Sequence, residues 1–177
     1  AILGISGGID SALVAALACR ALGAQNLVGL IMPSKFSSSH SIEDAELLAR
    51  NAGFEKRFVP IKMPHSTLQM ALQPFFQGMP EDVTEENLQS RIRGLTVMAF
   101  ANKFHALALA TGNRSEFAMG YATLYGDMCG ALAPIGDLLK TEVYELARFL
   151  NQDKAWIPER TFTKAPSAEL KPNQTDQ

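Results

Sequence analysis

Short apolar segments alternate with amphipathic segments along this chain of 177 residues. Residues 1–5 form an apolar run that stops at glycines, and residues 27–32 form a second run that ends at Pro33. Two further runs follow at 57–61 and 107–111. Runs of this length, closed by turn residues, are typical of buried parallel strands. The pattern therefore predicts a strand at each of the four places.

The segments between these runs have helical spacing. Residues 11–22 carry apolar side chains at intervals of four, and Gly23 supplies a stop signal. Ser41 begins a capping-box pattern that predicts a helix to about residues 51–53. A further helix is expected over 64–76.

The second half of the chain contains a long helix and a polar end. Thr84 is expected to cap a helix that runs to about Phe104 and is apolar around much of its circumference. Such a helix packs on two sides, and a homodimer interface would supply the second side. A last helix is expected over 139–150, whereas residues 158–177 read as a mobile loop or tail.

Alternating strands and helices predict an α/β fold, a doubly wound parallel sheet with helices on both faces. The length fits a single domain over residues 1–177. In this architecture ligands bind beyond the carboxyl ends of the strands. The segments expected to form the site are therefore 6–11, 32–36 and 111–116.

Composition limits the partners. The 16 basic and 18 acidic residues give a net charge of -2, which argues against a nucleic-acid-binding protein. No apolar run approaches the roughly 20 residues that cross a bilayer, and the start lacks the basic region of a signal peptide. Cys19 and Cys129 have no disulfide or zinc-site spacing, so we expect two reduced thiols in a cytoplasmic protein. Ala1 stands where an initiator Met is expected, which suggests a piece of a longer protein.

The strongest chemical signal is the Ser-Gly-Gly-Ile-Asp-Ser sequence at 6–11, between a strand and a helix. Its glycines let the backbone approach a bulky anion, and the helix start presents free N–H groups to it. Asp10 would repel a phosphate unless a cation lay between them, so it suggests Mg²⁺. The alternative is a tight turn in which Asp10 or Ser11 caps the helix.

This hexapeptide resembles the pyrophosphate-binding loop of the ATP pyrophosphatase superfamily. Further motifs narrow the resemblance: Glu-Asn-Leu-Gln-Ser-Arg-Ile-Arg-Gly at 86–94, Thr-Gly-Asn-Arg-Ser-Glu at 111–116, Gly-Tyr-Ala-Thr-Leu-Tyr-Gly-Asp at 120–127, Pro-Ile-Gly-Asp-Leu-Leu-Lys-Thr at 134–141 and Pro-Ser-Ala-Glu-Leu at 166–170. In this order and spacing the set looks like NAD synthetase over nearly the whole chain.

The resemblance implies a two-step ligase reaction. The nicotinate carboxylate of deamido-NAD attacks the α-phosphate of ATP, which gives an adenylate and pyrophosphate. Ammonia, free or derived from glutamine, then attacks the activated carbonyl and releases AMP. A carboxylate alone is a poor acceptor for ammonia because oxide would have to leave, and adenylation removes that obstacle.

The resemblance also implies roles for single residues. The loop expected to hold the ATP phosphates comprises Gly4, Ile5, Ser6, Gly7, Gly8, Ile9, Asp10 and Ser11. The other expected ATP contacts are Met32, Thr111, Lys140 and Ser167. The expected deamido-NAD contacts are Asn87, Arg91, Glu116 and Asp127, and the expected Mg²⁺ ligands are Asp10 and Glu116. The residues expected to take part in catalysis are Asp10, Lys140 and Asp127.

Most of these side chains have an ordinary structural alternative. Glu116 could simply stabilise a helix start after Asn113. Arg91 and Arg93 could lie on a solvated face and pair with nearby acids, and Lys140 could be a plain surface lysine. Tyr121 and Tyr125 could be core aromatics, and the three histidines read as structural or surface residues.

Two departures from the family pattern bear on function. Leu124 stands where single-domain members often have Lys, and the motif wording also occurs in glutamine-dependent enzymes, in which a glutaminase domain delivers ammonia. Such a domain would lie outside this chain. The competing functions are a GMP-synthetase-like or tRNA-thiolating ATP pyrophosphatase, and a nucleotide-binding module without turnover.

Overall fold

A three-stranded parallel sheet forms the centre of the molecule in a computed structural model, which describes residues 1–171 and 174. The strands are β1 (Ile2–Gly4), β2 (Val28–Ile31) and β3 (Glu55–Phe58), hydrogen-bonded in that order. Val28 is the register partner of Ile2 on one side and of Glu55 on the other. All neighbours run parallel, as the alternation of strands and helices predicts.

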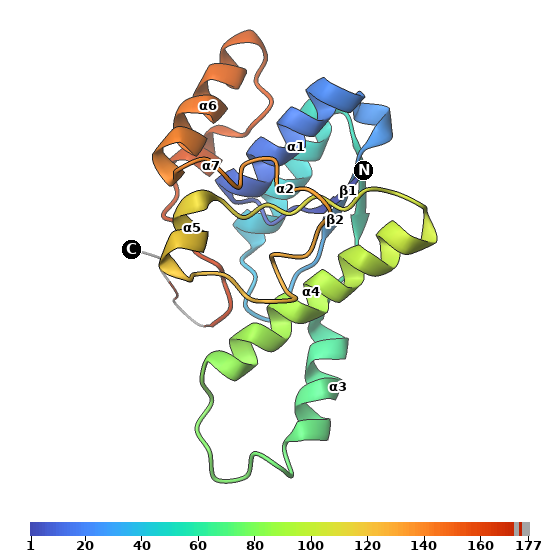
Figure 1. Cartoon of the computed structure of the whole chain (residues 1–177), viewed down its shortest axis with the longest axis vertical. Helices are drawn as coiled ribbons and strands as arrows, with labels where there is room; N and C mark the ends of the chain where they lie inside the picture. Colours follow the sequence, from blue (N-terminus) through green and yellow to red (C-terminus); the bar gives the residue numbers. More distant parts are fainter. Residues whose placement is uncertain (172–173, 175–177) are drawn as a thin grey trace.

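Helices cover both faces of the sheet (Figure 1). In chain order they are α1 (Ile9–Leu22), the short 3-10 helix η1 (Ala24–Asn26), α2 (Ser39–Ala52), α3 (Lys62–Leu72), α4 (Val83–Lys103), α5 (Arg114–Met119), α6 (Lys140–Asp153) and α7 (Glu159–Thr163). Helices α1 and α2 pack on one face and α4 on the other, while α6 packs against α1. The doubly wound α/β arrangement expected from the sequence is confirmed.

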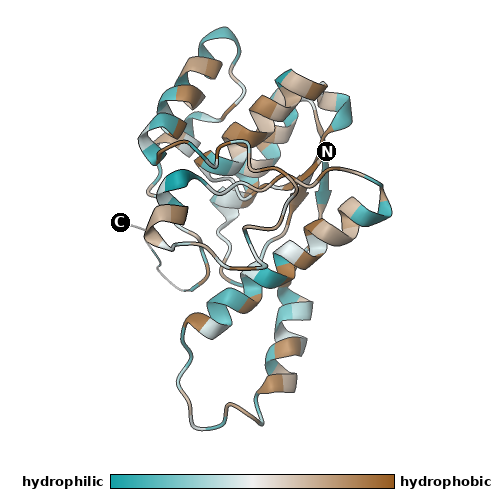
Figure 2. Ribbon diagram, in the orientation of Figure 1, coloured by the Kyte–Doolittle hydropathy of each residue, from teal (hydrophilic) through white to brown (hydrophobic). Residues whose placement is uncertain are grey.

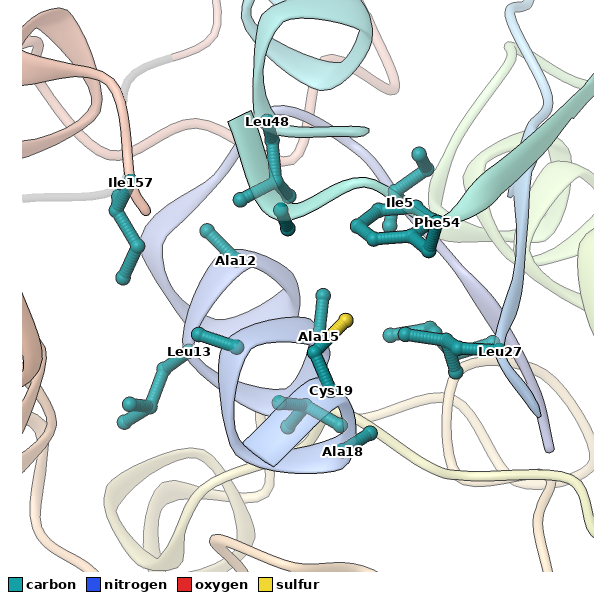
Figure 3. Packing of buried hydrophobic residues seen from close by; sticks show 14 of the residues in the cluster. Ile5, Ala12, Leu13, Ala15, Ala18, Cys19, Leu27, Leu48, Phe54 and Ile157 are labelled. Atoms are coloured by element: carbon teal, nitrogen blue, oxygen red, sulfur yellow. The ribbon is translucent and has the colours of Figure 1, made fainter. Parts of the chain in front are cut away.

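The two faces are filled by alternate residues of each strand. Leu3 and Ile5 join the core beneath α1 and α2, whereas Ile2 joins the core beneath α4. Figure 3 shows how the small side chains of α1, such as Ala12 and Ala15, lie among larger neighbours from the strands and α2. Small residues on α1 let the helix approach the sheet closely.

Two predicted strands differ from the structure. The third strand occupies Glu55–Phe58 and not 57–61, because Gly53 in the left-handed conformation ends α2 and turns the chain directly into the strand. The segment at 107–111 forms isolated parallel bridges, Ile2 with Ala108 and Leu109 with Leu132, where a fourth strand is predicted. The segment lies beside β1, but the pairing is too short to form a ladder.

Three helix starts also differ from the predictions. Helix α1 begins at Ile9, two residues before the predicted start. Helix α2 is capped by the Ser38 hydroxyl, which accepts a hydrogen bond from the Ser41 N–H at 3.1 Å, so the prediction of a start at Ser41 is wrong. Helix α4 is capped by Asp82, whose carboxylate accepts from the Thr84 N–H at 2.7 Å.

Two further helices are bounded differently. Helix α3 covers Lys62–Leu72, shorter at its end than the predicted 64–76. Helix α7 (Glu159–Thr163) lies where the sequence predicts a loop or tail from residue 158. Part of that predicted tail, residues 172, 173 and 175–177, lies outside the described residues.

Helix α3, the loop that follows it and the first part of α4 extend away from the rest of the molecule, while the second part of α4 packs on the sheet (Figure 1). Val97 on α4 is buried against the sheet, and Gly94 lies against the backbone of residues 125 and 126. Leu95, between them in sequence, is 70% exposed. Figure 2 shows brown apolar positions along this extension as well as around the sheet. Within the described part of the chain, every helix is too short or too polar to span a bilayer.

Candidate active site

A cavity of about 670 Å³ opens at the carboxyl ends of β1 and β2, beside the segment that follows the Ala108 and Leu109 bridges. This is the edge at which a doubly wound sheet binds its ligands. Of the residues predicted to form the site, most line this cavity: Gly4, Ile5, Ser6, Gly8, Ile9, Asp10, Ser11, Met32, Thr111, Glu116, Asp127, Lys140 and Ser167. Predicted residues from five separate motifs, up to 163 positions apart in the sequence (Gly4 and Ser167), thus line one cavity.

The loop after β1 leaves the start of α1 open to a ligand. Gly8 occupies the N-cap position, and α1 has no side-chain cap hydrogen bond. The Ser11 hydroxyl instead accepts from the Ser6 N–H and contacts the Gly8 carbonyl oxygen, each at 3.2 Å. The alternative in which Asp10 or Ser11 caps the helix is therefore wrong. Uncapped N–H groups at the positive end of a 14-residue helix suit an anion such as phosphate.

Gly7 does not line the cavity but fixes the loop from behind. Its φ of 79° lies in the left-handed region, and a Cβ there would be 2.3 Å from the Ser41 carbonyl oxygen of α2. Glycine is required by both the conformation and the close approach. The loop is thus held against the first turns of α2.

Asp10 is the centre of a small polar cluster. Its carboxylate accepts a hydrogen bond from Asn113 Nδ2 at 2.8 Å and forms an ion pair with the Lys140 ammonium. Lys140 is the first residue of α6, and its backbone N–H donates to the Ser115 hydroxyl at 3.0 Å. The alternative of a plain surface lysine is not supported, because its side chain points into the cavity and pairs with a phosphate-loop carboxylate.

Glu116 belongs to the same group of charges. Its carboxylate accepts from the Asn113 N–H at 3.1 Å while its own N–H donates to Asn113 Oδ1 at 3.0 Å, which completes a capping box for α5. Glu116 therefore does stabilise the helix start after Asn113, as the structural alternative states. Burial raises the pKa of this carboxyl group, and the negative charge of Asp10 raises it further. Capping a helix does not require a half-buried place beside another carboxylate. Glu116 also lines the cavity, where its carboxylate can contact a ligand.

Asp127 is held by α4. Its carboxylate accepts from the Ser90 hydroxyl at 3.0 Å and from the Thr123 N–H at 2.9 Å. Asn87 and Arg91, which do not line the cavity, bind the same loop: the Thr123 hydroxyl contacts Asn87 Oδ1 at 2.8 Å, and Arg91 Nε donates to the Leu124 carbonyl at 3.2 Å. The motif on α4 therefore positions the loop that carries Asp127.

Arg93 lines the cavity, which excludes the alternative of a solvated face that the sequence left open for it. The side chain is enclosed, its Nε donates to the Met32 carbonyl at 3.1 Å, and burial lowers its pKa to about 10. The signal that could have found it is helical spacing, since Arg93 lies four residues after buried Gln89 and four before buried Val97. The backbone of Met32, an expected ATP contact, thus accepts a hydrogen bond from this arginine.

Other candidate residues lie as follows. Tyr121 and Tyr125 are 50% and 73% exposed, so neither is a core aromatic. His65 is buried, and Cys19 and Cys129 are free thiols, as predicted. Among the described residues, no group of three or more His, Cys, Asp and Glu side chains forms a metal site. A metal here would rest on two carboxylates and on ligands supplied by the substrate.

Known proteins of similar sequence belong to one family. A family profile described as NAD synthase matches residues 1–177. The chain is 57% identical over 176 residues to a glutamine-dependent NAD(+) synthetase of Synechocystis sp., covering 99% of this chain and 32% of that protein. A glutamine-dependent NAD(+) synthetase of Thermotoga maritima is 53% identical over 179 residues, with 99% and 31% covered. The chain thus spans about a third of the length of these curated relatives.

Solved structures show the same likeness. A glutamine-dependent NAD+ synthetase of Acinetobacter baumannii in complex with ADP superposes with a TM-score of 0.90 at 45% identity, covering 96% of this chain and 33% of that one. An NMN synthetase of Francisella tularensis gives 0.88 at 31% identity, with 99% and 69% covered. An NH3-dependent NAD synthetase of Campylobacter jejuni gives 0.81 at 35% identity, with 92% and 66% covered. From the profile match over its whole length and these likenesses, this chain belongs to the NAD synthase family.

Proposed function

We propose that this chain is the ATP-dependent, amide-forming synthetase part of an NAD synthetase. The observation that carries the proposal is the convergence of Asp10, Glu116 and Lys140 on one cavity beside the uncapped start of α1. The ADP complex of the Acinetobacter baumannii relative supports adenine-nucleotide binding at this fold. The substrates would be ATP, deamido-NAD and ammonia.

The reaction divides between the two ends of the cavity. The loop from Gly4 to Ser11, with Lys140, would bind the ATP phosphates, and Met32, Thr111 and Ser167 would contact the rest of the nucleotide. The deamido-NAD carboxylate attacks the α-phosphate, the bond to the β-phosphate breaks, and pyrophosphate leaves. Ammonia then adds to the acyl carbon, loses a proton, and displaces AMP. Lys140 would offset the charge that develops on the phosphate oxygens.

Magnesium fits the charges of the cavity. Asp10 and Glu116 offer the carboxylate oxygens that Mg²⁺ prefers, and burial together with the negative charge of Asp10 raises the pKa of Glu116, which a cation between the two would offset. We infer that these two residues hold the ion. Bound there, Mg²⁺ would neutralise phosphate charge during adenylation.

The second substrate would lie beside Asp127. Asn87 and Arg91 would act on it by holding the loop at 123–127, since both bind that loop in this chain. Glu116 would border the same substrate. These roles predict that changes at Asn87 or Arg91 alter the KM for deamido-NAD more than the KM for ATP.

The test is pyrophosphate release by the full-length protein with ATP, deamido-NAD and a nitrogen donor, each omitted in turn. Release that requires all three supports the proposal. Ammonium and glutamine are compared as donors, and nicotinate mononucleotide is included because the NMN synthetase structure is similar. Release only with xanthine nucleotide or tRNA would support the other ATP pyrophosphatases, and ATP binding without release would support an inert module.

We also infer a homodimer through the α3–α4 extension and a cytoplasmic location. Large apolar side chains are exposed on these two helices and the loop between them: Met63, Met70, Phe75, Met79 and Leu95. Clustered exposure of this kind marks interaction surfaces. Sedimentation of the protein and of a Leu95→Glu variant tests the dimer, since a charge at the interface should shift the variant to a monomer.

A further inference from the structure

One wall of the cavity is formed late in the chain. Thr161 of α7 and residues 164–170, which follow directly on α7, line the cavity. Ser167, the nucleotide contact proposed above, lies in the middle of this wall. A segment with little regular structure holds such a position only if side chains attach it to the body.

The attachment centres on Asp44 of α2, which does not itself line the cavity. Its side chain is 1% exposed, and its two oxygens bind two cations of the wall segment. Arg160 Nε donates to Oδ1 at 2.7 Å, and Lys164 Nζ donates to Oδ2 at 3.3 Å. A carboxylate so deeply buried is tolerated because both oxygens have charged donors.

The same turns of α2 hold the phosphate loop. Ser41 donates from its hydroxyl to Glu169 at 2.8 Å and accepts from Lys164 Nζ at 3.1 Å. Its carbonyl oxygen is the atom that a Cβ on Gly7 would approach to 2.3 Å. One turn of α2 therefore contacts both the phosphate loop and the wall at 161–170, and Asp44 lies one turn further along.

We propose that Asp44 is a positioning residue: through Arg160 and Lys164 it sets the distance between the wall at 161–170 and the phosphate loop, so that Ser167 reaches bound ATP. The inference rests on the proposed function for the identity of the ligand. Asp44 touches neither substrate in this arrangement. Its loss should therefore weaken ATP binding more than it slows the chemical step.

Steady-state kinetics of Asp44→Asn in the full-length protein test this. Asparagine keeps the size and removes the charge. The KM for ATP should rise about tenfold, in line with the loss of a buried ion pair whose partners are partly exposed, while kcat changes little. The matched control is Glu43→Gln, because Glu43 also binds Arg160, at 3.0 Å, but is 58% exposed. The control should leave both constants unchanged.

Limited trypsin cleavage separates positioning from simple stabilisation. Cleavage after Lys164 should be faster in Asp44→Asn than in the wild type, and saturating ATP with Mg²⁺ should slow it in both. A variant with a lower Tm but unchanged cleavage and unchanged KM would overturn the inference. If Asp44→Asn does not fold, Arg160→Gln removes the same contact from the exposed partner and should reproduce the result.

The failure of this inference differs from that of the proposed function. If the wild type releases no pyrophosphate with any substrate, the proposed function is wrong. Protection of Lys164 by ATP then still tests the positioning role. If the wild type is active and both variants behave like it, Asp44 does not position the wall.

Discussion

Gly94 offers a test in which the structure reverses the expectation from helix propensity. Replacing a glycine in a helix interior by alanine normally stabilises the helix by about 1 kcal/mol. At Gly94 a Cβ would lie 2.6 Å from the Gly126 carbonyl oxygen, 2.9 Å from that of Tyr125 and 3.0 Å from the sulfur of Cys129. The two nearest neighbours are backbone atoms, so the movement of a side chain alone cannot make room for the Cβ.

The magnitude follows from two opposing effects. Overpacking of this kind costs about 1–3 kcal/mol, which offsets or exceeds the gain of about 1 kcal/mol from propensity. We expect Gly94→Ala to be less stable by up to about 2 kcal/mol, a fall in Tm of up to about 8 °C. The displaced loop carries Asp127, so the KM for deamido-NAD should rise as well.

Calorimetry and steady-state kinetics of the variant are the measurements. Asn102→Ala on the exposed side of the same helix is the control, since its Cβ has room and alanine is the better helix former. That control should be neutral or slightly more stable. A Gly94→Ala protein that is more stable than the wild type, with an unchanged KM, would refute the reasoning from the close approach.

Three other predictions concern charge, thiols and the phosphate loop. Burial raises the pKa of Glu116, so the folded state disfavours its ionisation and loses stability as pH rises through that pKa. Glu116→Gln should therefore raise the Tm near pH 7, and the gain should vanish in acid. A series of Tm measurements against pH checks both. Burial raises the pKa of Cys19 to about 11, so this thiol should react with a thiol reagent more slowly than Cys129. Substrates should protect Cys129 because it lines the cavity. Labelling followed by mass spectrometry measures both rates. Gly7→Ala should reduce ATP affinity at least tenfold by driving the loop away from Ser41, which equilibrium binding of ATP can detect.

The local motifs of the site were readable from the sequence because they are short and continuous. The Gly-Gly turn, the apolar strand before it and the helix after it lie within residues 1–22, and the structure has each of them. The contact between Asp10 and Lys140 is different, since it joins residues 130 apart. Spacing carries no information on such a pair, and only the resemblance to a family brought the two together in advance.

Errors at the helix starts have a common cause. The stretch at 37–41 offers four serines that could cap α2, and local preference does not rank them. In the structure the Ser38 hydroxyl caps the helix and also donates to Glu169 at 2.7 Å, a residue 131 positions away. The start of α2 is therefore decided together with the position of the cavity wall.

Polarity alone favoured a solvated face for Arg93, the alternative that the sequence left open and the structure excludes. A charged residue on a helix is usually solvated, yet this one occupies the stripe of Gln89 and Val97. A buried guanidinium is retained where it meets an anion or serves a ligand, because its desolvation is otherwise unfavourable. A largely buried arginine on a helix, such as Arg93, is therefore a signal of a binding site.

The charges of the cavity point to the kind of ligand it accepts. Burial raises the pKa of Glu116 and lowers that of Arg93, so each group is shifted against its charged form. Both signs of charge are therefore incompletely compensated in one enclosed space. A ligand of one sign would relieve one group and worsen the other, whereas a polyphosphate bound together with a cation would relieve both. We therefore expect ATP to bind more tightly with Mg²⁺ than with EDTA, as equilibrium binding in the two buffers will show.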